Sequence, residues 1–443
     1  MEYTFFLVFS WWQYRKAIQK NWQKEMKKFE KKNFPPQKVF HLVILATCGE
    51  SIKILEESIQ SITNSNFDKK KIIFCLATEE RKKNSGRKNA AIIEKKISKN
   101  FKKFFWIEHP KNLPNEIIGK GANISFAAKQ VSKKLKQENF DIKKILVTTL
   151  DADNRVHPDL FSLLAIKFST DRKRHQKSFQ PIPLFFNNIW SVPILNRMVA
   201  ISSGFWHLIE SGRPDRLRNF SSHSQPLSAL IEMNFWDKNT IVEDGRQFFR
   251  SYLHFFGNYS VEPIFLPIYQ DAAAGENYFR SLVGQYKQLR RWAWGASDIA
   301  YFLNGIFKNF KKLPKLKTFL YLWRLIEGHY IWATSAIFLT ISHFIWFLNP
   351  EFSQTVFSGH FLFLVFWFFK IALVGIFTAM LITFLTLPPP PKFWQSFSIL
   401  WQWLFFPIMT IFFGSAPALE SQIRLALGQK MKFSVTKKIR KTA

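Results

Sequence analysis

Two carboxylates stand one residue apart directly after an apolar run. Ile145–Leu150 has the composition of a buried strand, and Asp151-Ala152-Asp153 follows it without a gap. A hard divalent cation prefers oxygen ligands and would bridge a diphosphate. The pair therefore predicts a site with one carboxylate toward a nucleotide and the other toward a metal ion. A turn followed by a helix starting at Pro158 is the alternative interpretation.

A second acidic pair, Glu243-Asp244, lies between a turn-rich stretch and an amphipathic helix. A carboxylate held near an acceptor hydroxyl can take its proton as that hydroxyl attacks. Acidic residues also occur at helix N-termini, where they complement the dipole. The pair alone does not separate these two interpretations.

The segment Gln288-Leu289-Arg290-Arg291-Trp292 combines guanidinium groups with an indole. Guanidinium groups bind a diphosphate through several directed hydrogen bonds, and an indole offers a flat face for a sugar ring. A basic aromatic helix at a membrane surface would look similar. Its position in the chain relative to the acidic pairs decides between the two.

Four short apolar runs are predicted to be the strands that position these side chains. The segments between the runs have apolar residues at helical spacing. The predicted strands are Val43–Ala46, Ile72–Ala77, Phe104–Ile107 and Ile145–Leu150. Helices are predicted over Glu50–Thr63 and Ala122–Leu135. This alternation is typical of a parallel α/β sheet, in which ligands bind beyond the carboxyl ends of the strands.

Composition limits the class of protein. The chain has 443 residues, and 47% of them are hydrophobic, which excludes a disordered protein. Lys and Arg number 63 against 31 Asp and Glu, a net charge of +32 that favours phosphate groups, nucleic acid or anionic lipid as partners. Two cysteines, Cys48 and Cys75, exclude a disulfide scaffold and fit buried, reduced thiols.

Three long apolar stretches crowd the C-terminal part of the chain. They are Gly328–Leu348, Val356–Leu387 and Phe393–Leu419, and Pro388–Pro391 form a stiff connection between the last two. At about 1.5 Å per residue, each is long enough for a transmembrane helix. Lys and Arg flank them, which predicts a multi-pass protein of the cell (inner) membrane with its soluble part in the cytoplasm.

The same pattern divides the chain into five parts. Tyr14, Ile18, Trp22, Met26 and Phe29 recur at helical spacing among lysines, which predicts a basic amphipathic membrane-interface segment over residues 1–37. A helix packed on the soluble domain is the alternative. The other predicted parts are a catalytic domain (38–295), an amphipathic interface helix (296–327), a transmembrane region (328–419) and a basic tail (420–443), whose side of the membrane stays open.

In chain order, these elements resemble a known family. The shared elements are a strand ending near Glu50, Gly119–Asn123, Asp151–Asp153, Glu243-Asp244 and Gln288–Trp292 ahead of membrane helices. This order resembles the membrane-integrated family 2 glycosyltransferases, which include cellulose, chitin and hyaluronan synthases. The resemblance implies a GT-A-like (Rossmann-like) α/β catalytic domain followed by C-terminal transmembrane helices.

The resemblance also implies roles for individual residues. The donor would be a nucleotide sugar, a UDP-sugar above all, with Mg²⁺ or Mn²⁺ as cofactor held by Asp153. Donor-binding side chains would be Glu79, Lys120, Asp151 and Arg291. The acceptor, a glycan or a lipid-linked molecule, would meet Gln288 and Trp292. Asp244, beside Glu243, would be the catalytic base.

Two positions depart from the family's pattern. The family has an aspartate pair after the second strand to hold base and ribose, whereas this chain has Glu79-Glu80, and Glu79 is the expected substitute. The threonine of the family's Thr-Glu-Asp motif is Val242 here, which changes a supporting contact and leaves the carboxylates in place.

The predicted activity is a single displacement at the anomeric carbon that inverts its configuration, used to make or extend a polysaccharide. A glycosidase would need two carboxylates flanking the bond and no cationic grip on a diphosphate. A polyprenyl-phosphate glycosyltransferase is the nearest alternative. A non-enzymatic basic membrane protein that binds anionic lipid or nucleic acid is an alternative of another class, although we expect no nucleic-acid partner.

Overall fold

Apolar runs rich in β-branched and aromatic residues form the sheet at the centre of the molecule. The computed structural model describes residues 1–433, 436 and 438, without the side chains of 343–348, 353 and 362. The four strands predicted from sequence are present and pair in parallel, in the order β3-β2-β1-β4. Their bounds are β1 Phe40–Ala46, β2 Ile72–Glu79, β3 Lys103–His109 and β4 Ile145–Asp151.

Four further strands extend this sheet to eight and make it mixed. They are β5 Arg155–Val156, β6 Lys177–Leu184, β7 Ser224–Pro226 and β8 Ser260–Tyr269, and the order continues β4-β7-β6-β8-β5. The three-residue strand β7 is antiparallel to both of its neighbours. The predicted parallel arrangement therefore holds for the four strands named from sequence, and the four additional strands make the whole sheet mixed.

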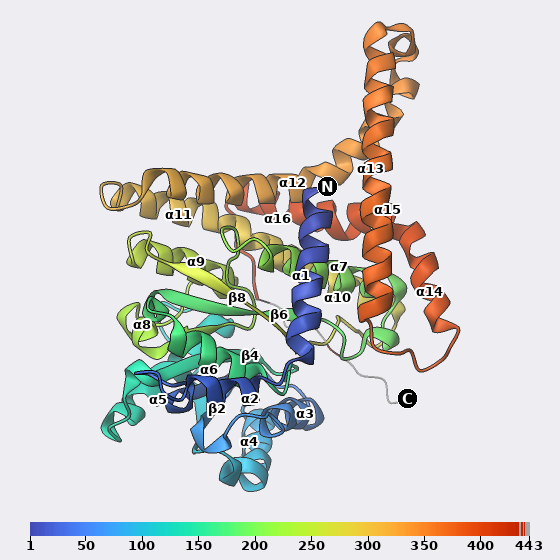
Figure 1. Ribbon diagram of the computed structural model, residues 1–443. Coiled ribbons are helices and arrows are strands. Elements are labelled where there is room, and N and C mark those ends of the chain that lie inside the picture. The colour runs from blue at the N-terminus through green and yellow to red at the C-terminus, as the bar shows by residue number, and fades with distance from the viewer. Residues whose placement is uncertain (434–435, 437, 439–443) are drawn as a thin grey trace.

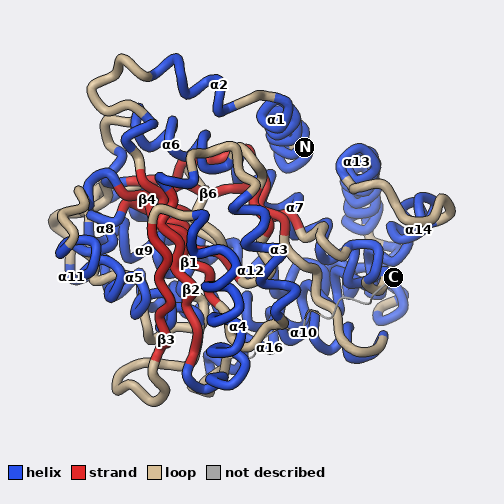
Figure 2. The backbone as a smooth tube through the Cα atoms, turned by 90° about the horizontal axis from the view of Figure 1, so that it is seen from below, coloured by secondary structure: helices blue, strands red, loops and turns tan. Residues whose placement is uncertain are grey.

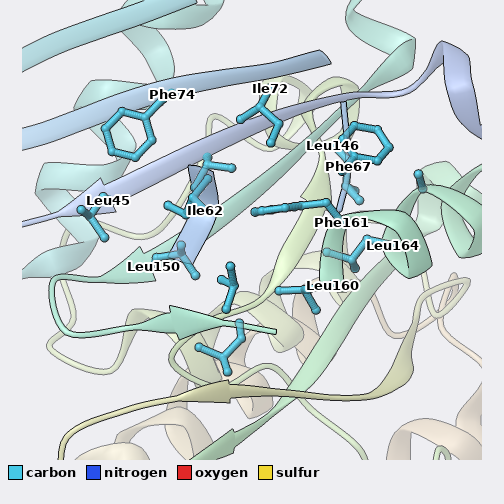
Figure 3. Close-up of a cluster of buried hydrophobic side chains, with 14 of the residues drawn as sticks. Leu45, Ile62, Phe67, Ile72, Phe74, Leu146, Leu150, Leu160, Phe161 and Leu164 are labelled. Atoms are coloured by element: carbon cyan, nitrogen blue, oxygen red, sulfur yellow. The ribbon is translucent and has the colours of Figure 1, made fainter. Parts of the chain in front are cut away.

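Helices cover both faces of the sheet, as an α/β fold requires (Figure 1). One face packs against α3 (Ile52–Thr63), α4 (Lys83–Ile97) and α6 (Leu160–Thr170) through a large apolar cluster. Figure 3 shows part of that cluster, in which Phe74, Leu146 and Phe161 are fully buried. The opposite face packs against α5 (Lys120–Gln137) and α8 (Leu227–Glu232).

The N-terminal segment differs from the predicted membrane-surface helix. It forms α1 (Glu2–Gln19) and α2 (Trp22–Met26), with Asn21 capping the second helix. The apolar stripe packs on the protein: Tyr14 joins the cluster shared with α7, and Met26 joins the core beneath α6. The helical spacing of apolar residues shows that one face of the segment is covered. Packing on protein and packing on lipid require the same spacing, so the sequence does not separate them. The exposed face of α1 carries other residues instead: Phe5, Val8, Phe9 and Trp12.

Four helices lie at the carboxyl edge of β4 and build the surroundings of the predicted site. They are α7 (Ile194–Ser211), α9 (Glu243–His254), α10 (Tyr278–Ala293) and α11 (Ser297–Lys308). The predicted interface helix 296–327 is divided between α11 and the start of α12 (Lys315–Leu348). Its Phe302 is fully buried against α9, whereas Phe307 and Phe310 are exposed.

The C-terminal region is helical and largely apolar. It comprises α12, α13 (Val356–Thr386), α14 (Gln395–Gln402), α15 (Phe406–Met409), a π-helical turn (Thr410–Ser415) and α16 (Ala416–Ala426). Within the described residues, Val356–Thr386 and the stretch Gln395–Ala426 are long and apolar enough to cross a membrane. The predicted crossing Gly328–Leu348 is the second half of α12, and part of it lies outside the described side chains.

The N-terminal helix is tied to this region. In Figure 1, α1 stands beside α13, and in Figure 2, which views the molecule from below, the two helices again lie next to each other. The Trp11 indole donates to Thr386 Oγ1 at 2.9 Å, and Ile382 of α13 lies in the same apolar cluster as Leu7. Of the basic tail, Lys437 and residues 439–443 lie outside the described residues.

Gly121 tests the packing that sets up the site. A Cβ there would lie 2.6 Å from the Asp237 carbonyl oxygen and 2.8 Å from Glu243 Cβ. We expect Gly121→Ala to lower the free energy of unfolding by about 1–3 kcal/mol, because neither neighbour can move freely. Gly284 in α10 has no atom within 4 Å of such a Cβ, so Gly284→Ala should raise stability by up to about 1 kcal/mol. Thermal and chemical unfolding of both variants measure this, and equal effects would contradict it.

Candidate active site

The first carboxylate, Asp151, is the last residue of β4 and is held by a lysine from α5. Lys120 Nζ lies 2.6 Å from Asp151 Oδ1, and the Ser221 hydroxyl donates to Asp151 Oδ2 at 2.5 Å. Burial by itself raises the pKa of Asp151, but Lys120, and then Lys438, lower it to about 2. The carboxylate is therefore ionised, and Lys120 stays charged beside it.

The second carboxylate, Asp153, meets two groups that the sequence did not predict. Its Oδ1 lies 2.6 Å from Nζ of Lys438 in the tail, and its Oδ2 accepts a 2.6 Å hydrogen bond from the Asp271 backbone N–H. Asp271 comes two residues after β8 ends. Burial and then repulsion from Asp153 raise the pKa of Asp271 to about 7, while Lys438 opposes the shift. Two carboxylates thus share one cation at this point.

The second acidic pair lies at the start of α9, as the helix interpretation required, and it also faces the site. The first turn of α5 packs against it, since Gly121 leaves room for Glu243. Burial is the main cause that raises the pKa of both carboxyls, and for Glu243 repulsion from Asp244 is the next. Lys120 and Arg291 both act in the opposite direction. Glu243 is buried and Asp244 is partly exposed, and the charge of the pair is only partly balanced.

Helix α10 presents the side chains of the Gln-Arg-Trp segment. Gln288 Oε1 accepts from Gln285 Nε2 at 3.0 Å, and Trp292 packs against Phe185 with ring centroids 5.9 Å apart. The guanidinium carbon of Arg291 lies 5.3 Å from the centroid of the Phe433 ring in the tail. The tail therefore reaches the site on this side as well.

The C-terminal helices fix the position of α10. Glu420 in α16 accepts from the Tyr286 hydroxyl at 2.9 Å and pairs with Arg290 at 2.6 Å. Both partners lie on α10 close to Gln288 and Arg291. The apolar region is therefore part of the scaffold of the site.

Glu79, at the end of β2, is engaged by a neighbour. Arg81 forms an ion pair with it and also donates to Cys48 Sγ at 3.2 Å. Nearby Glu50 accepts from the Cys48 backbone N–H at 2.6 Å. This corner joins the ends of β1 and β2, where a nucleoside would meet backbone groups and a fixed carboxylate.

One cavity of about 1110 Å³ connects all these groups. Every side chain that the sequence singled out lines it: Glu79, Lys120, Asp151, Asp153, Glu243, Asp244, Gln288, Arg291 and Trp292. Ligand pockets typically measure about 300–1,000 Å³, so this one lies just above the upper end of that range. Sequence reasoning missed four contributors, Ser221, Asp271, Phe433 and Lys438, because nothing local to them marks them as part of a site.

The residues present fit a divalent cation. Within the described part of the chain, no three His, Cys, Asp or Glu side chains gather closely enough to hold a metal ion. Asp153 and Asp271 nevertheless supply two carboxylates, and the Lys438 ammonium already occupies the position of a cation against Asp153. Proteins commonly bind Mg²⁺ through one or two carboxylates, and the phosphates of a substrate complete the coordination of the ion.

No protein-family model matches this sequence, and no curated protein matches it either. Solved structures with some similarity include the mannosyltransferase PcManGT of Pyrobaculum calidifontis in complex with GDP-Man and Mn²⁺. That match has 11% identity, covers 97% of this chain and 100% of the other, and has a TM-score of 0.48.

Structures of S. aureus TarS also match. TarS 1–349 has 12% identity over 89% of this chain and 94% of its own, with a TM-score of 0.42. Its complex with UDP has 12% identity over 90% and 95%, with a TM-score of 0.41. At these identities and TM-scores the similarities carry no argument about activity, so the function must come from the residues of the site.

Proposed function

We propose that this chain is a metal-dependent, inverting glycosyltransferase that moves a sugar from a nucleotide-diphosphate donor to an acceptor hydroxyl. One observation carries the proposal: nine side chains predicted from five separate sequence segments line a single cavity. Independent motifs of chance origin would be scattered over the surface. The chemistry of the nine is complementary, since cations, carboxylates and an indole each match one part of such a reaction.

The donor's diphosphate is bound by cationic side chains. Lys120 is oriented by Asp151 and remains protonated, because Asp151 and Glu243 raise its pKa against the effect of burial. Arg291 contributes the second charge from α10. Fixed cations aimed at a departing diphosphate stabilise its developing charge without reorganisation. Glu79, held by Arg81, lies where the base and ribose of the donor, in our proposal a UDP-sugar, would bind.

Asp153 and Asp271 would hold Mg²⁺ or Mn²⁺. When bound, such an ion neutralises and orients a diphosphate leaving group. Lys438 would compete with such an ion for Asp153, because both are cations that the same carboxylate attracts.

Asp244 is the base in this proposal. The pair with Glu243 shares a buried environment, so one of the two tends to keep a proton while the other stays ionised. Asp244 takes the proton of the acceptor hydroxyl, and the attack on the opposite side of the anomeric carbon from the diphosphate inverts the configuration. Gln288 and Trp292 line the same cavity on the acceptor side.

Membrane attachment and polysaccharide synthesis complete the proposal. Two apolar stretches able to cross a membrane and the exposed aromatic face of α1 support attachment. The resemblance in motif order supports a family 2 synthase acting at the cytoplasmic face of the cell membrane.

The direct test gives the purified full-length chain radiolabelled nucleotide sugars with Mn²⁺ or Mg²⁺. We expect release of nucleoside diphosphate and a labelled product, whose length reports polymer formation and whose linkage reports inversion. No release with any nucleotide sugar, from protein that unfolds cooperatively, would reject the proposal.

Loss of the metal ligand should abolish turnover. We expect Asp153→Asn to lower kcat about a hundredfold or more, because a bound metal ion is worth several kcal/mol to a departing diphosphate. Asp141→Asn, an exposed carboxylate on the turn before β4, is the matched control and should leave kcat unchanged. Equal activity of Asp153→Asn and wild type would remove the metal from this mechanism.

Lys438 should compete with the metal ion. We expect Lys438→Ala to tighten Mn²⁺ binding several-fold, since the ion no longer has to displace an ammonium group from Asp153. Calorimetric titration of Mn²⁺ into both proteins measures this without reference to turnover. Weaker Mn²⁺ binding in Lys438→Ala would show that the lysine supports the ion instead.

The acidic pair should control the low-pH side of activity. Because the pKa of Asp244 is raised by burial, activity should fall as pH drops through that value and Asp244 gains a proton. Glu243→Gln should leave the acid limb of kcat in place to within about half a pH unit, because burial and repulsion from Asp244 raise the pKa of Glu243 to about 7, so Glu243 already carries a proton where Asp244 titrates. Asp244→Asn should lose about 10²–10⁴-fold in kcat. An acid limb that moves by a full pH unit or more in Glu243→Gln would contradict this assignment.

A further inference from the structure

Four arginines that the proposed donor site does not use line the same cavity. Three come from the loop between α7 and β7 and one from α12: Arg213, Arg216, Arg218 and Arg324. No role in donor binding falls on them in the proposed function. Their number in one enclosed space requires compensation by anions.

Most of that compensation comes from the protein itself. Arg213 pairs with Glu210 and with Glu2 of α1. Arg324 pairs with Asp215 at 2.9 Å. These two guanidinium groups are neutralised and serve the fold. Arg216 is less well matched, since its nearest carboxylate, that of Glu2, also used by Arg213, lies 3.8 Å away.

Arg218 is different. Its guanidinium carbon lies 5.7 Å from the Phe249 ring centroid, and burial lowers its pKa. Among the described residues, it forms no ion pair within 4.0 Å and no hydrogen bond. An unpaired, largely desolvated cation destabilises a folded protein. We infer that an unpaired cation on a cavity wall binds an anion that comes from outside the protein.

The position of Arg218 relative to the base follows from Asp298. Burial raises the pKa of Asp298 to about 6; Arg246 and then Arg218 lower it, and Asp244 adds repulsion. Asp298 thus lies within electrostatic reach of both Arg218 and Asp244. The Asp298 carboxylate also faces Gly245, 3.6 Å from where a Cβ there would lie. Arg218 and Asp244 are therefore both neighbours of Asp298, and all three side chains line the cavity.

Apolar side chains also line this cavity. They come from α7, α12 and the segment around the π-helical turn: Trp206, Tyr321, Leu325, Trp332, Met409 and Phe413. A free sugar chain would leave these surfaces without a matching partner. A molecule that joins an anionic group to a hydrocarbon chain would match both the arginine and the walls.

We propose that the acceptor is a phosphate-bearing amphiphile, whose phosphate binds Arg218 and whose hydrocarbon chain lies along α12 and the π-helical turn. This inference rests on the proposed sugar transfer, because it names the molecule that receives the sugar. It assigns to Arg218 a contact with the acceptor, with Arg216 closer to the solvent. The hydroxyl that Asp244 deprotonates would belong to a sugar carried by this amphiphile.

A binding experiment tests the site without reference to turnover. The full-length chain in phosphatidylcholine nanodiscs is titrated with farnesyl phosphate, with farnesol and with inorganic phosphate, and calorimetry gives each affinity. We expect farnesyl phosphate to bind at least tenfold more tightly than either comparator. Equal binding of inorganic phosphate would reject the hydrocarbon part of the proposal, and equal binding of farnesol would reject the phosphate part.

Two variants assign the binding to Arg218. Arg218→Met keeps an unbranched chain against Phe249 and should weaken farnesyl phosphate binding at least tenfold, while Arg218→Lys should retain part of it. Arg87→Met, which removes an exposed arginine elsewhere, should bind like wild type. Because Arg218→Met removes an uncompensated charge, its thermal midpoint should equal or exceed that of wild type. Unchanged farnesyl phosphate affinity in Arg218→Met would overturn the proposal.

The same preparations separate this inference from the proposed function. Sugar transfer is assayed with a farnesyl-phosphate-linked sugar and with a neutral farnesyl glycoside as acceptors. Absence of transfer to both, with Arg218-dependent binding intact, rejects the transferase and leaves the phosphate site. Transfer to both with equal KM in wild type rejects the phosphate-bearing acceptor and leaves the transferase.

Discussion

The balance of charge inside one cavity is the constraint on which the rest of this structure depends. Nine carboxylates line it, and Asp271 lies beside one of them, Asp153; the nine are Glu50, Glu79, Asp151, Asp153, Glu210, Glu243, Asp244, Asp298 and Glu327. At an effective dielectric constant of about 20, two charges 4 Å apart interact by about 4 kcal/mol, so such a group cannot remain ionised without cations. Lys120, Lys438 and Arg246 supply three of them. Burial is the largest cause of the raised pKa values of Glu243, Asp244, Asp271 and Asp298, and repulsion from a neighbouring carboxylate is the second cause for Glu243 and Asp271.

The candidate site was largely predictable because its chemistry is carried by contiguous motifs at fixed points of the fold. Asp151 and Asp153 follow a buried strand, and in an α/β sheet that position lies at the ligand-binding edge. Asp271 and Lys438 were not predictable. They reach Asp153 across 118 and 285 residues of chain, and neither lies in a motif. The basic tail was interpreted only by its charge, which does not tell where a tail folds.

The elements of the fold also differ in how well the sequence predicts them. The four parallel strands are seven or eight residues long, and β1, β2 and β4 are almost wholly buried, so the sequence predicts them, whereas β5 and β7 have two and three residues and leave no periodic pattern. The stripe of Tyr14 to Phe29 was read as helical and apolar on one side, but α6 and the α7 cluster cover it instead of lipid. The third apolar stretch divides into α14, α15, a π-helical turn and α16, because proline interrupts it and α10 offers a polar partner in the middle of the region.

The contact between α1 and α13 also has a consequence for how the chain is made. Trp11 and its partner Thr386 are 375 residues apart. At a synthesis rate of about 5–20 residues per second, the first helix waits about 20–75 seconds on the ribosome before its partner exists. During that interval its aromatic residues have no protein surface from α13 to cover them. The contact between α1 and α13 therefore forms only after the whole sheet between them has been synthesised.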